Sequence, residues 1–226
     1  MIQDEFKEIF ARFGLSVKQV QDRLAEIGMG DYSKNLIHPK ERSWAHYSYF
    51  AMASLVLKNV KFILEIGTGC GQSTNVLIKL FPNAIVYTVD VGPNDPNWIQ
   101  TWRGSYPEKA NVYYKNLTHK NIVVLESNSF FLPALDLPEQ FSLIFVDGDH
   151  TYPAVASDVS FAYSHMESGG FLFMHDYDAE KKRNDVHRVI DWLAEIIEEK
   201  IFFCPEFTHE KKGRNLKVAY LIKEER

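Results

Sequence analysis

Two short clusters of acidic and histidine residues follow apolar runs in the second half of the chain. The first holds Asp147, Asp149 and His150, and the second is the pair His175 and Asp176. An imidazole titrates near neutral pH, so His150 is our first candidate for a general base that takes a proton from a hydroxyl group, with Asp147 acting beside it. The alternative, that His150 only caps the helix that follows it, stays open.

A glycine-rich stretch at residues 62–74 is the third candidate for chemistry. An apolar run containing one acid breaks into three glycines spaced by two, and a polar helix start follows. Glycine permits a sharp turn and lets a ligand approach the backbone, while the helix start offers N–H groups to a carboxylate or phosphate. A dinucleotide-binding turn would need a third glycine at position 72, where this chain has Gln72. The predicted binding residues of this stretch are Glu65, Gly67, Thr68, Gly69 and Gly71.

An acid also closes the next apolar run, residues 84–90. Asp90 lies 19 residues after Gly71, a spacing that suits one helix and one strand. An acid at the end of that strand is well placed to accept hydrogen bonds from both ribose hydroxyls of a nucleoside. The alternative is an ordinary turn residue; the position after a glycine turn favours the ribose interpretation.

Strands and helices that alternate along the chain must position these residues. We expect strands at 62–66, 84–90, 122–126, 141–146 and 171–174, and a closing hairpin of strands at 201–203 and 217–222. The helix after His150 should end at Gly169 and Gly170. This alternation predicts an α/β, Rossmann-like fold with a seven-stranded, mostly parallel sheet, one antiparallel strand and helices on both faces. Every polar cluster follows the carboxyl end of a strand, where such sheets bind ligands.

Two regions outside this pattern have open roles. Residues 1–58 are predicted to form an N-terminal helical cap and 59–226 the core; the cap either only stabilises the fold or closes over a substrate. The aromatic segment 91–121 forms either a wall of the substrate pocket or a surface helix whose rings pack back on the fold.

Composition excludes several classes of protein. The 226 residues are 46% hydrophobic and 24% charged, an ordinary globular balance, and the net charge of −5 gives no support for a nucleic-acid or membrane partner. Two cysteines allow no disulfide framework, and the charged start shows no signal peptide, so a cytoplasmic protein is expected. A homo-oligomer through the N-terminal helices is a further expectation.

The glycine stretch resembles the first motif of the class I S-adenosylmethionine-dependent methyltransferases. The pairing of residues 145–150 with 174–177 is similar to their small-molecule O-methyltransferase branch, which includes antibiotic-tailoring, sugar and catechol-type enzymes. The resemblance covers residues 60–177 or so. It implies that S-adenosylmethionine is the cofactor, that the glycine turn wraps its methionine part, and that Ser127 and Asn128 approach its adenine amino group.

The same resemblance implies a divalent cation such as magnesium, held by Asp147 and Asp176. His175 stands where some relatives carry an acid and is a further candidate ligand, or a second candidate base. Loop and helix capping is the alternative for the two Asp residues.

The implied activity is transfer of a methyl group from S-adenosylmethionine to a hydroxyl oxygen of a small molecule. One alternative is an NAD-dependent oxidoreductase on a similar sheet, against which Gln72 argues. The other is a non-catalytic cofactor-binding protein, which would have no use for the acids and histidine at 147–150. The sequence does not identify the methyl acceptor.

Overall fold

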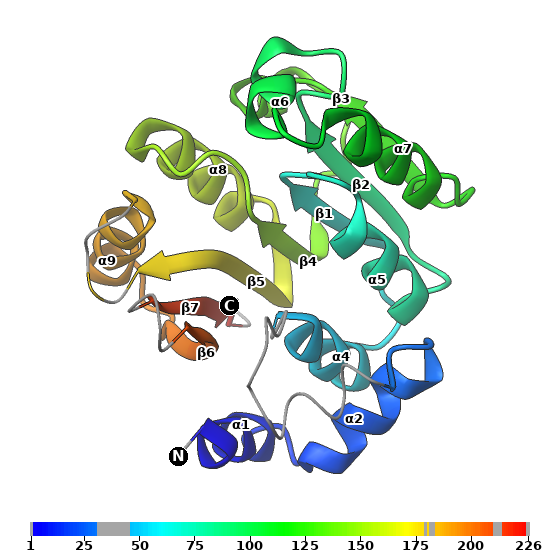
Figure 1. Cartoon of the computed structure of the whole chain (residues 1–226). Helices are drawn as coiled ribbons and strands as arrows, with labels where there is room; N and C mark the ends of the chain where they lie inside the picture. The colour runs from blue at the N-terminus through cyan, green and yellow to red at the C-terminus, as the bar shows by residue number, and fades with distance from the viewer. Residues whose placement is uncertain (1, 31–45, 179, 181–183, 210–213, 225–226) are drawn as a thin grey trace.

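The computed structural model describes residues 2–30, 46–178, 180, 184–209 and 214–224 (Figure 1). Its centre is a seven-stranded sheet in the order β3-β2-β1-β4-β5-β7-β6. Strands β1 to β5 pair in parallel, and β7 is antiparallel to both β5 and β6. The predicted mostly parallel sheet with one antiparallel strand is therefore confirmed. The strands are β1 Phe62–Ile66, β2 Ile85–Asp90, β3 Ile122–Glu126, β4 Phe141–Val146, β5 Met166–Asp178, β6 Phe202–His209 and β7 Arg214–Ile222.

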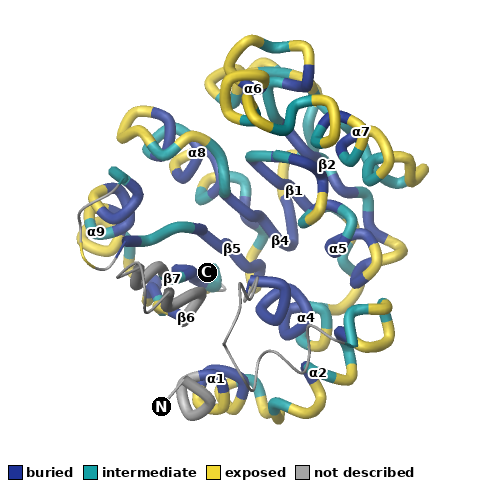
Figure 2. The backbone as a smooth tube through the Cα atoms, viewed as in Figure 1, coloured by how far each residue is buried: buried dark blue, intermediate teal, exposed yellow. Residues whose placement is uncertain are grey.

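Helices cover both faces of this sheet, and the central strands β1 and β4 are almost wholly buried (Figure 2). One apolar cluster joins α1, α2, α4 and α5 to one face, and a second joins α8 and α9 to the other. Successive side chains of a strand point to opposite faces of the sheet, so the same strands contribute residues to both clusters. Phe145 and Phe173 face α4, whereas Ile144 and Leu172 face α8 and α9. The helices are α1 Ile2–Ala11, α2 Val17–Glu26, α4 His46–Val56, α5 Gln72–Leu80, α6 Pro96–Thr101, α7 Tyr106–Asn116, η1 Ser129–Ala134, α8 Tyr152–Ser164 and α9 Val186–Ile196.

The N-terminal helices pack through aromatic rings. Phe6 of α1 stacks on Tyr49 of α4 at 5.8 Å, and Phe13 contacts Phe171 of β5 at 5.6 Å. A capping box of Ser16 and Gln19 starts α2. These helices therefore share one apolar cluster with the sheet. The division into a cap at 1–58 and a core at 59–226 stays a prediction, and residues 31–45 of the predicted cap lie outside the described residues.

The boundary between α8 and β5 differs from the sequence-based expectation. The helix ends at Ser164, not at Gly169 and Gly170, and β5 already starts at Met166. Met166 is fully buried and pairs with Phe141, while the ladder shifts register before Leu143. The glycines form this irregularity inside the strand: Gly169 has a φ of +76° and its N–H donates to the carbonyl of Lys223.

The aromatic segment 91–121 forms α6 and α7, which lie beside β2 and β3 (Figure 1). Trp98 and Tyr113 are buried and contact each other edge to face at 6.0 Å, with Trp102 and Tyr106 packed against them. Of the two alternatives for this segment, the burial of Trp98 and Tyr113 favours rings that pack back on the fold.

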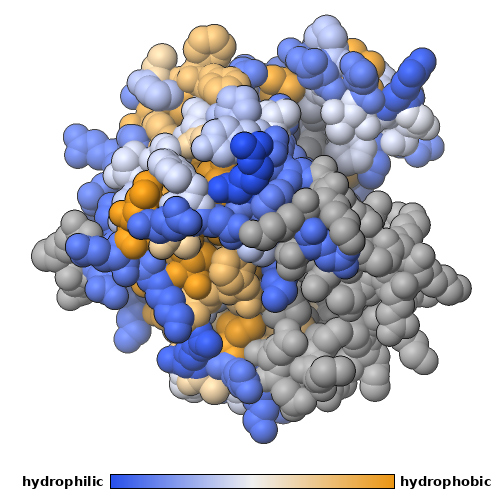
Figure 3. Space-filling view, turned by 90° about the vertical axis from the view of Figure 1, so that its left-hand side faces the viewer, coloured by the Kyte–Doolittle hydropathy of each residue, from blue (hydrophilic) through white to orange (hydrophobic). Residues whose placement is uncertain are grey.

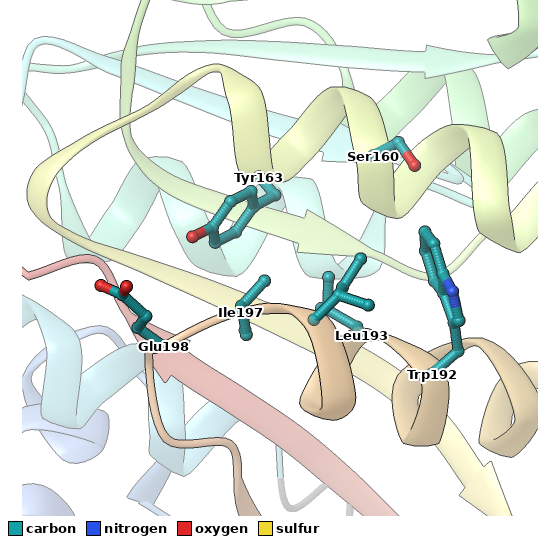
Figure 4. Close-up of a pocket in the computed structure, with 7 residues that line it drawn as sticks. Ser160, Tyr163, Trp192, Leu193, Ile197 and Glu198 are labelled. Carbon is teal, nitrogen blue, oxygen red and sulfur yellow. The ribbon is translucent and has the colours of Figure 1, made fainter.

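Among the described residues no helix is long and apolar enough to cross a membrane. The predicted cytoplasmic location stays a prediction. On the side of the molecule shown in Figure 3, hydrophobic residues appear between hydrophilic ones. A groove of about 430 Å³ lies between α8 and α9 and shares no residue with the polar clusters (Figure 4). Its lining is Ser160, Tyr163, Trp192, Leu193, Ile196, Ile197 and Glu198.

Candidate active site

The glycine turn between β1 and α5 lies directly beside the first polar cluster. Gly67, Gly69 and Gly71 all have positive φ, the backbone region in which glycine is favoured. A Cβ atom on Gly67 would lie 2.1 Å from the carbonyl oxygen of Asp147, so only glycine fits there. The Asp147 N–H donates to the Ile66 carbonyl at 2.8 Å, which fixes the two loops together. The turn and the cluster therefore form one site.

Helices α6 and α7 hold the glycine turn from the side. The Trp98 indole N–H donates to the Gly69 carbonyl at 3.3 Å, and the Asn116 amide donates to the Cys70 carbonyl at 2.9 Å. Two carbonyl groups of the turn are thus oriented by side chains from the aromatic segment. Nothing in the sequence pattern links Trp98 or Asn116 to the turn.

Glu65 lies beneath the turn and is fully buried. One carboxylate oxygen accepts hydrogen bonds from the hydroxyls of Thr74 and Thr88, and the Thr88 hydroxyl also lies 2.6 Å from that of Thr68. Burial raises the pKa of Glu65 to about 7, although hydrogen bonds to neighbouring hydroxyls oppose the shift. Glu65 and Thr68 support the turn from inside; direct cofactor contact stays a prediction for both.

Asp90 ends β2 with its carboxylate facing the glycine turn. One oxygen accepts from the Gly69 N–H at 2.8 Å and the other from the Val91 N–H at 2.7 Å. Burial raises the pKa of this carboxyl group, and these backbone hydrogen bonds oppose the shift. Each carboxylate oxygen can accept more than one hydrogen bond. The structure therefore places Asp90 beside the turn, and its contact with ribose stays a prediction.

Ser127 and Asn128 follow β3 on the same edge of the sheet. The Ser127 N–H donates to the Asp90 carbonyl at 2.8 Å, so this loop is joined to the end of β2. The Asn128 side-chain oxygen caps η1 by accepting from the Phe130 N–H at 3.0 Å. Its second lone pair is left for the predicted adenine amino group.

The strand pattern explains how Asp147 and His175 come together. Asp147 follows Phe145 by two residues and His175 follows Phe173 by two, so both side chains point to the face that α4 covers. Asp176 breaks this alternation. It has a φ of +56°, and the register of β5 shifts between Met174 and Tyr177. This left-handed residue turns its carboxylate into the same cluster as His175, because strict alternation would send it to the opposite face.

The cluster is compact. Ligand atoms of Asp147, His175 and Asp176 all lie within 4.8 Å of one another. His175 Nδ1 lies 3.0 Å from Asp147 Oδ1 and 3.5 Å from Asp176 Oδ2. His150 Nε2 lies 3.3 Å from Asp176 Oδ2 and 3.9 Å from Asp147 Oδ1. The structure therefore brings Asp147, His150, His175 and Asp176 together, whereas the exposed Asp149 accepts from the Thr151 N–H. The roles of these side chains stay predictions.

The charges in this cluster shift the pKa values of its members. Burial alone would raise the pKa of Asp147, but the charge on His175, with the contacts from His150 and His175, holds that pKa well below its usual range. The pKa of His150 is raised by Asp147, against an opposing effect of burial, and by the charge of Asp176. At 3.9 Å the Asp147–His150 contact is too long for a full hydrogen bond, so charge attraction dominates it.

His46 is a residue that the sequence analysis missed. It starts α4, is 2% exposed, and its Nδ1 lies 3.1 Å from Nε2 of His175. Its ring stacks on Phe145 with centroids 5.5 Å apart. In the sequence, His46 stands out only as a histidine in an otherwise largely apolar and aromatic helix. Its approach to His175 depends on how that helix packs against the sheet, and local sequence does not determine those tertiary contacts.

Comparison with known proteins identifies the architecture. A family model described as a methyltransferase domain matches residues 64–177, about half of the chain. The matched range starts in β1 and ends just after Asp176. The chain belongs to this methyltransferase family. The predicted family and the expectation of an enzyme are confirmed, and the NAD-dependent oxidoreductase is set aside.

Relatives of this methyltransferase are distant. The uncharacterized protein R132 of Acanthamoeba polyphaga mimivirus is 33% identical over 70 residues, which are 30% of this chain and 31% of that protein. The chain thus spans about a third of the length of that relative.

Solved structures share the fold of this methyltransferase. The O-methyltransferase TomG from Streptomyces achromogenes, involved in tomaymycin synthesis and solved in complex with S-adenosylmethionine, has a TM-score of 0.56 at 17% identity, with 99% of each chain covered. The N-methyltransferase NodS from Bradyrhizobium japonicum WM9 has a TM-score of 0.54 at 19% identity, with 80% of this chain and 95% of that chain covered. Because these proteins methylate different kinds of atom, the likeness identifies the fold and leaves the acceptor atom to the site.

Proposed function

We propose that this methyltransferase transfers the methyl group of S-adenosylmethionine to a hydroxyl oxygen of a small molecule. The observation that carries the proposal is the contact between the glycine turn and the Asp147 loop, which brings a candidate base beside a cofactor-binding turn. Methyl transfer is an in-line displacement at the sulfonium carbon, so the protein must orient the acceptor and remove its proton. A base beside the methyl donor meets both needs.

His150 is the proposed base. A hydroxyl group with a pKa well above neutral needs a base before it attacks, whereas a neutral amine does not. His150 is half-exposed, and Asp147 and Asp176 stabilise its charged form after it takes a proton. This pairing of an imidazole with two carboxylates favours an oxygen acceptor over a nitrogen acceptor.

The residues of the cluster also fit a divalent cation. Asp147, His175 and Asp176 would hold it, since their ligand atoms converge within 4.8 Å. A bound cation would lower the pKa of the acceptor hydroxyl. The acceptor itself is proposed to be a small hydroxylated molecule, because the net charge of −5 does not favour nucleic acid.

The first experiment is calorimetric titration of the purified chain with S-adenosylmethionine and, separately, with NAD. Saturable binding of S-adenosylmethionine that is weakened in Asp90→Ala supports the proposed cofactor. Binding of NAD alone would overturn it. Methyl transfer from labelled S-adenosylmethionine to a panel of catechols, sugars and hydroxylated aromatics then tests the reaction.

The variant His150→Gln separates catalysis from binding. We expect it to bind S-adenosylmethionine as the wild type does and to lose activity by about 10² to 10⁴ fold. Asp149→Asn is the matched control, since this exposed neighbour caps the Thr151 N–H and does not contact Asp147 or Asp176 in the described structure. Cofactor binding without methyl transfer to any hydroxyl compound would contradict the proposed oxygen acceptor.

A further inference from the structure

We propose that the cluster of Asp147, His175 and Asp176 selects a first-row transition ion such as Co²⁺, Fe²⁺ or Zn²⁺ over Mg²⁺, with His46 as the positioning residue for His175. This inference rests on the cation in the proposed function and goes beyond it in naming the ion class and the role of α4. It follows from the donor atoms and from the 3.1 Å contact between the two histidine rings.

The donor set is mixed. Two carboxylates supply oxygen atoms, but His175 directs its Nδ1 between them, 3.0 Å from Asp147 Oδ1 and 3.5 Å from Asp176 Oδ2. Mg²⁺ prefers oxygen ligands in octahedral geometry, whereas imidazole nitrogen suits the first-row transition ions. The ligand chemistry therefore favours a transition ion.

The contact with His46 fits a metal-bound His175. A nitrogen that binds a metal carries no proton, so ligation through Nδ1 of His175 places the ring proton on Nε2. Nε2 then donates to His46 Nδ1 across the observed 3.1 Å. Metal-binding histidines are generally held in this way by an acceptor on the second ring nitrogen, which sets the tautomer and the ring orientation.

The position of His46 is itself fixed by packing. The ring is 2% exposed, stacks on Phe145 and contacts Phe50 edge to face at 5.6 Å. His175 is 8% exposed and meets the His46 ring at an interplanar angle of 89°. Helix α4 therefore presents a rigid hydrogen-bond partner to the cluster, and the N-terminal region becomes part of the metal site through one side chain.

The test is calorimetric titration of the metal-depleted protein with Co²⁺ and with Mg²⁺, in the presence of S-adenosylhomocysteine. The wild type should bind Co²⁺ at least about 10-fold more tightly than Mg²⁺. His175→Glu, which makes the ligand set all oxygen, should narrow that ratio by about 10-fold. His46→Phe, which keeps a ring but removes the acceptor, should weaken Co²⁺ binding by about 10 to 100 fold. His46→Asn, which keeps an acceptor near the position of Nδ1, should recover part of the loss.

Nuclear magnetic resonance of the Co²⁺-loaded protein gives a readout independent of affinity. A ligated His175 should show a strongly shifted, solvent-exchangeable ring N–H signal that disappears or exchanges faster in His46→Phe. Equal affinity of the wild type for Co²⁺ and Mg²⁺, or no binding of either ion, would overturn the proposal. So would an unchanged Co²⁺ affinity in both His46 variants.

Binding of S-adenosylhomocysteine separates this inference from the proposed function. If S-adenosylhomocysteine binds but the Co²⁺ and Mg²⁺ titrations contradict the expected affinities, only the proposed ion selectivity is refuted. If S-adenosylhomocysteine does not bind, the proposed function is refuted. Should His46→Phe not fold, the wild-type ratio of Co²⁺ to Mg²⁺ affinity and the His46→Asn variant still decide the outcome.

Discussion

Gly67 packs against the backbone carbonyl oxygen of Asp147 so closely that a Cβ atom on residue 67 would lie 2.1 Å from it. The contact joins the predicted cofactor turn to the predicted catalytic loop through backbone atoms. Neither loop can move away easily, because the Gly67 N–H donates to Val89 and the Asp147 N–H donates to Ile66. Any side chain at position 67 must therefore displace the Asp147 loop.

Gly67→Ala should abolish binding of S-adenosylhomocysteine and lower the melting temperature, both measured on the purified variant. The expected cost exceeds the about 1 to 2 kcal/mol of the left-handed backbone alone, since overlap with the backbone of Asp147 and Gly148 adds to it. Gly14→Ala is the matched control: Gly14 has a φ of +68° but no atom within 4 Å of its Cβ position. Equal melting temperatures for the two variants would contradict the close contact.

The charged groups around His150 lead to a second prediction. Because Asp147 and Asp176 raise the pKa of His150, this residue should keep its proton above its ordinary titration range in the metal-free protein. Its base form is the neutral one, so a rate limited by proton removal should rise as pH increases through this raised pKa. Carbon-proton correlation spectra of the histidine rings, recorded against pH, measure the pKa directly.

Asp147→Asn should lower the pKa of His150, because the largest cause of the upward shift is lost. Asp149→Asn provides the comparison, since Asp149 is exposed and is not a cause of that shift. A His150 signal that titrates at or below the ordinary histidine range in the wild type would refute the arrangement of the three charges.

The sequence predicted the edge of the sheet on which the site lies, for a physical reason. Apolar runs that alternate with helical patterns determine a parallel sheet, and residues that follow such runs necessarily meet at its carboxyl edge. Asp90, Ser127, Asp147 and His175 are placed there by this rule alone. The spacing of two residues from Phe145 to Asp147 and from Phe173 to His175 also determines that both face α4.

Other features depend on contacts between segments that are distant in the sequence, so they could not be predicted from it. The left-handed backbone of Asp176 follows from a register shift against β7, and the approach of His46 follows from how α4 docks. The start of β5 was misplaced because a Gly-Gly pair is typical of a helix end, whereas here it forms an irregularity between paired strands. Local sequence reports none of these pairings.

Trp98 leads to a third prediction, which concerns support of the glycine turn. Its indole N–H donates to the Gly69 carbonyl. The residue is only 3% exposed, and its ring contacts the rings of Trp102, Tyr106 and Tyr113. Trp98→Phe keeps most of the packing and removes the hydrogen bond, so it should weaken S-adenosylhomocysteine binding several-fold while costing about 1 kcal/mol of stability. Calorimetry and urea unfolding measure the two effects.

Trp98→Ala distinguishes packing from the hydrogen bond, because deleting a buried indole ring should cost about 3 to 5 kcal/mol. Tyr114→Phe is the control on the same helix pair, since Tyr114 is 52% exposed. If Trp98→Phe leaves cofactor affinity unchanged, the indole N–H does not orient the turn.

Asp158 leads to the last prediction. It lies on α8, is fully buried, and neither carboxylate oxygen makes a hydrogen bond to the described residues. Burial raises its pKa to about 6, and the nearby Ser129 hydroxyl offsets only part of this shift. The pKa of this carboxyl group is higher in the folded protein than in the unfolded chain, where it is near 3.8. The free energy of unfolding therefore falls as pH rises from the unfolded pKa to the folded pKa. Above the folded pKa this loss of stability stays constant.

Asp158→Asn should therefore raise the free energy of unfolding at pH 8, and by about 1 kcal/mol more there than at pH 5, because the wild type loses stability over this interval and the amide does not titrate. Urea unfolding of both proteins at the two pH values measures the difference. Asp136→Asn, which alters an exposed carboxyl group, should give the same change at both pH values. A stability gain for Asp158→Asn that does not depend on pH, or a loss at pH 8, would mean that the buried carboxylate is compensated by a partner such as an ordered water or a bound ligand.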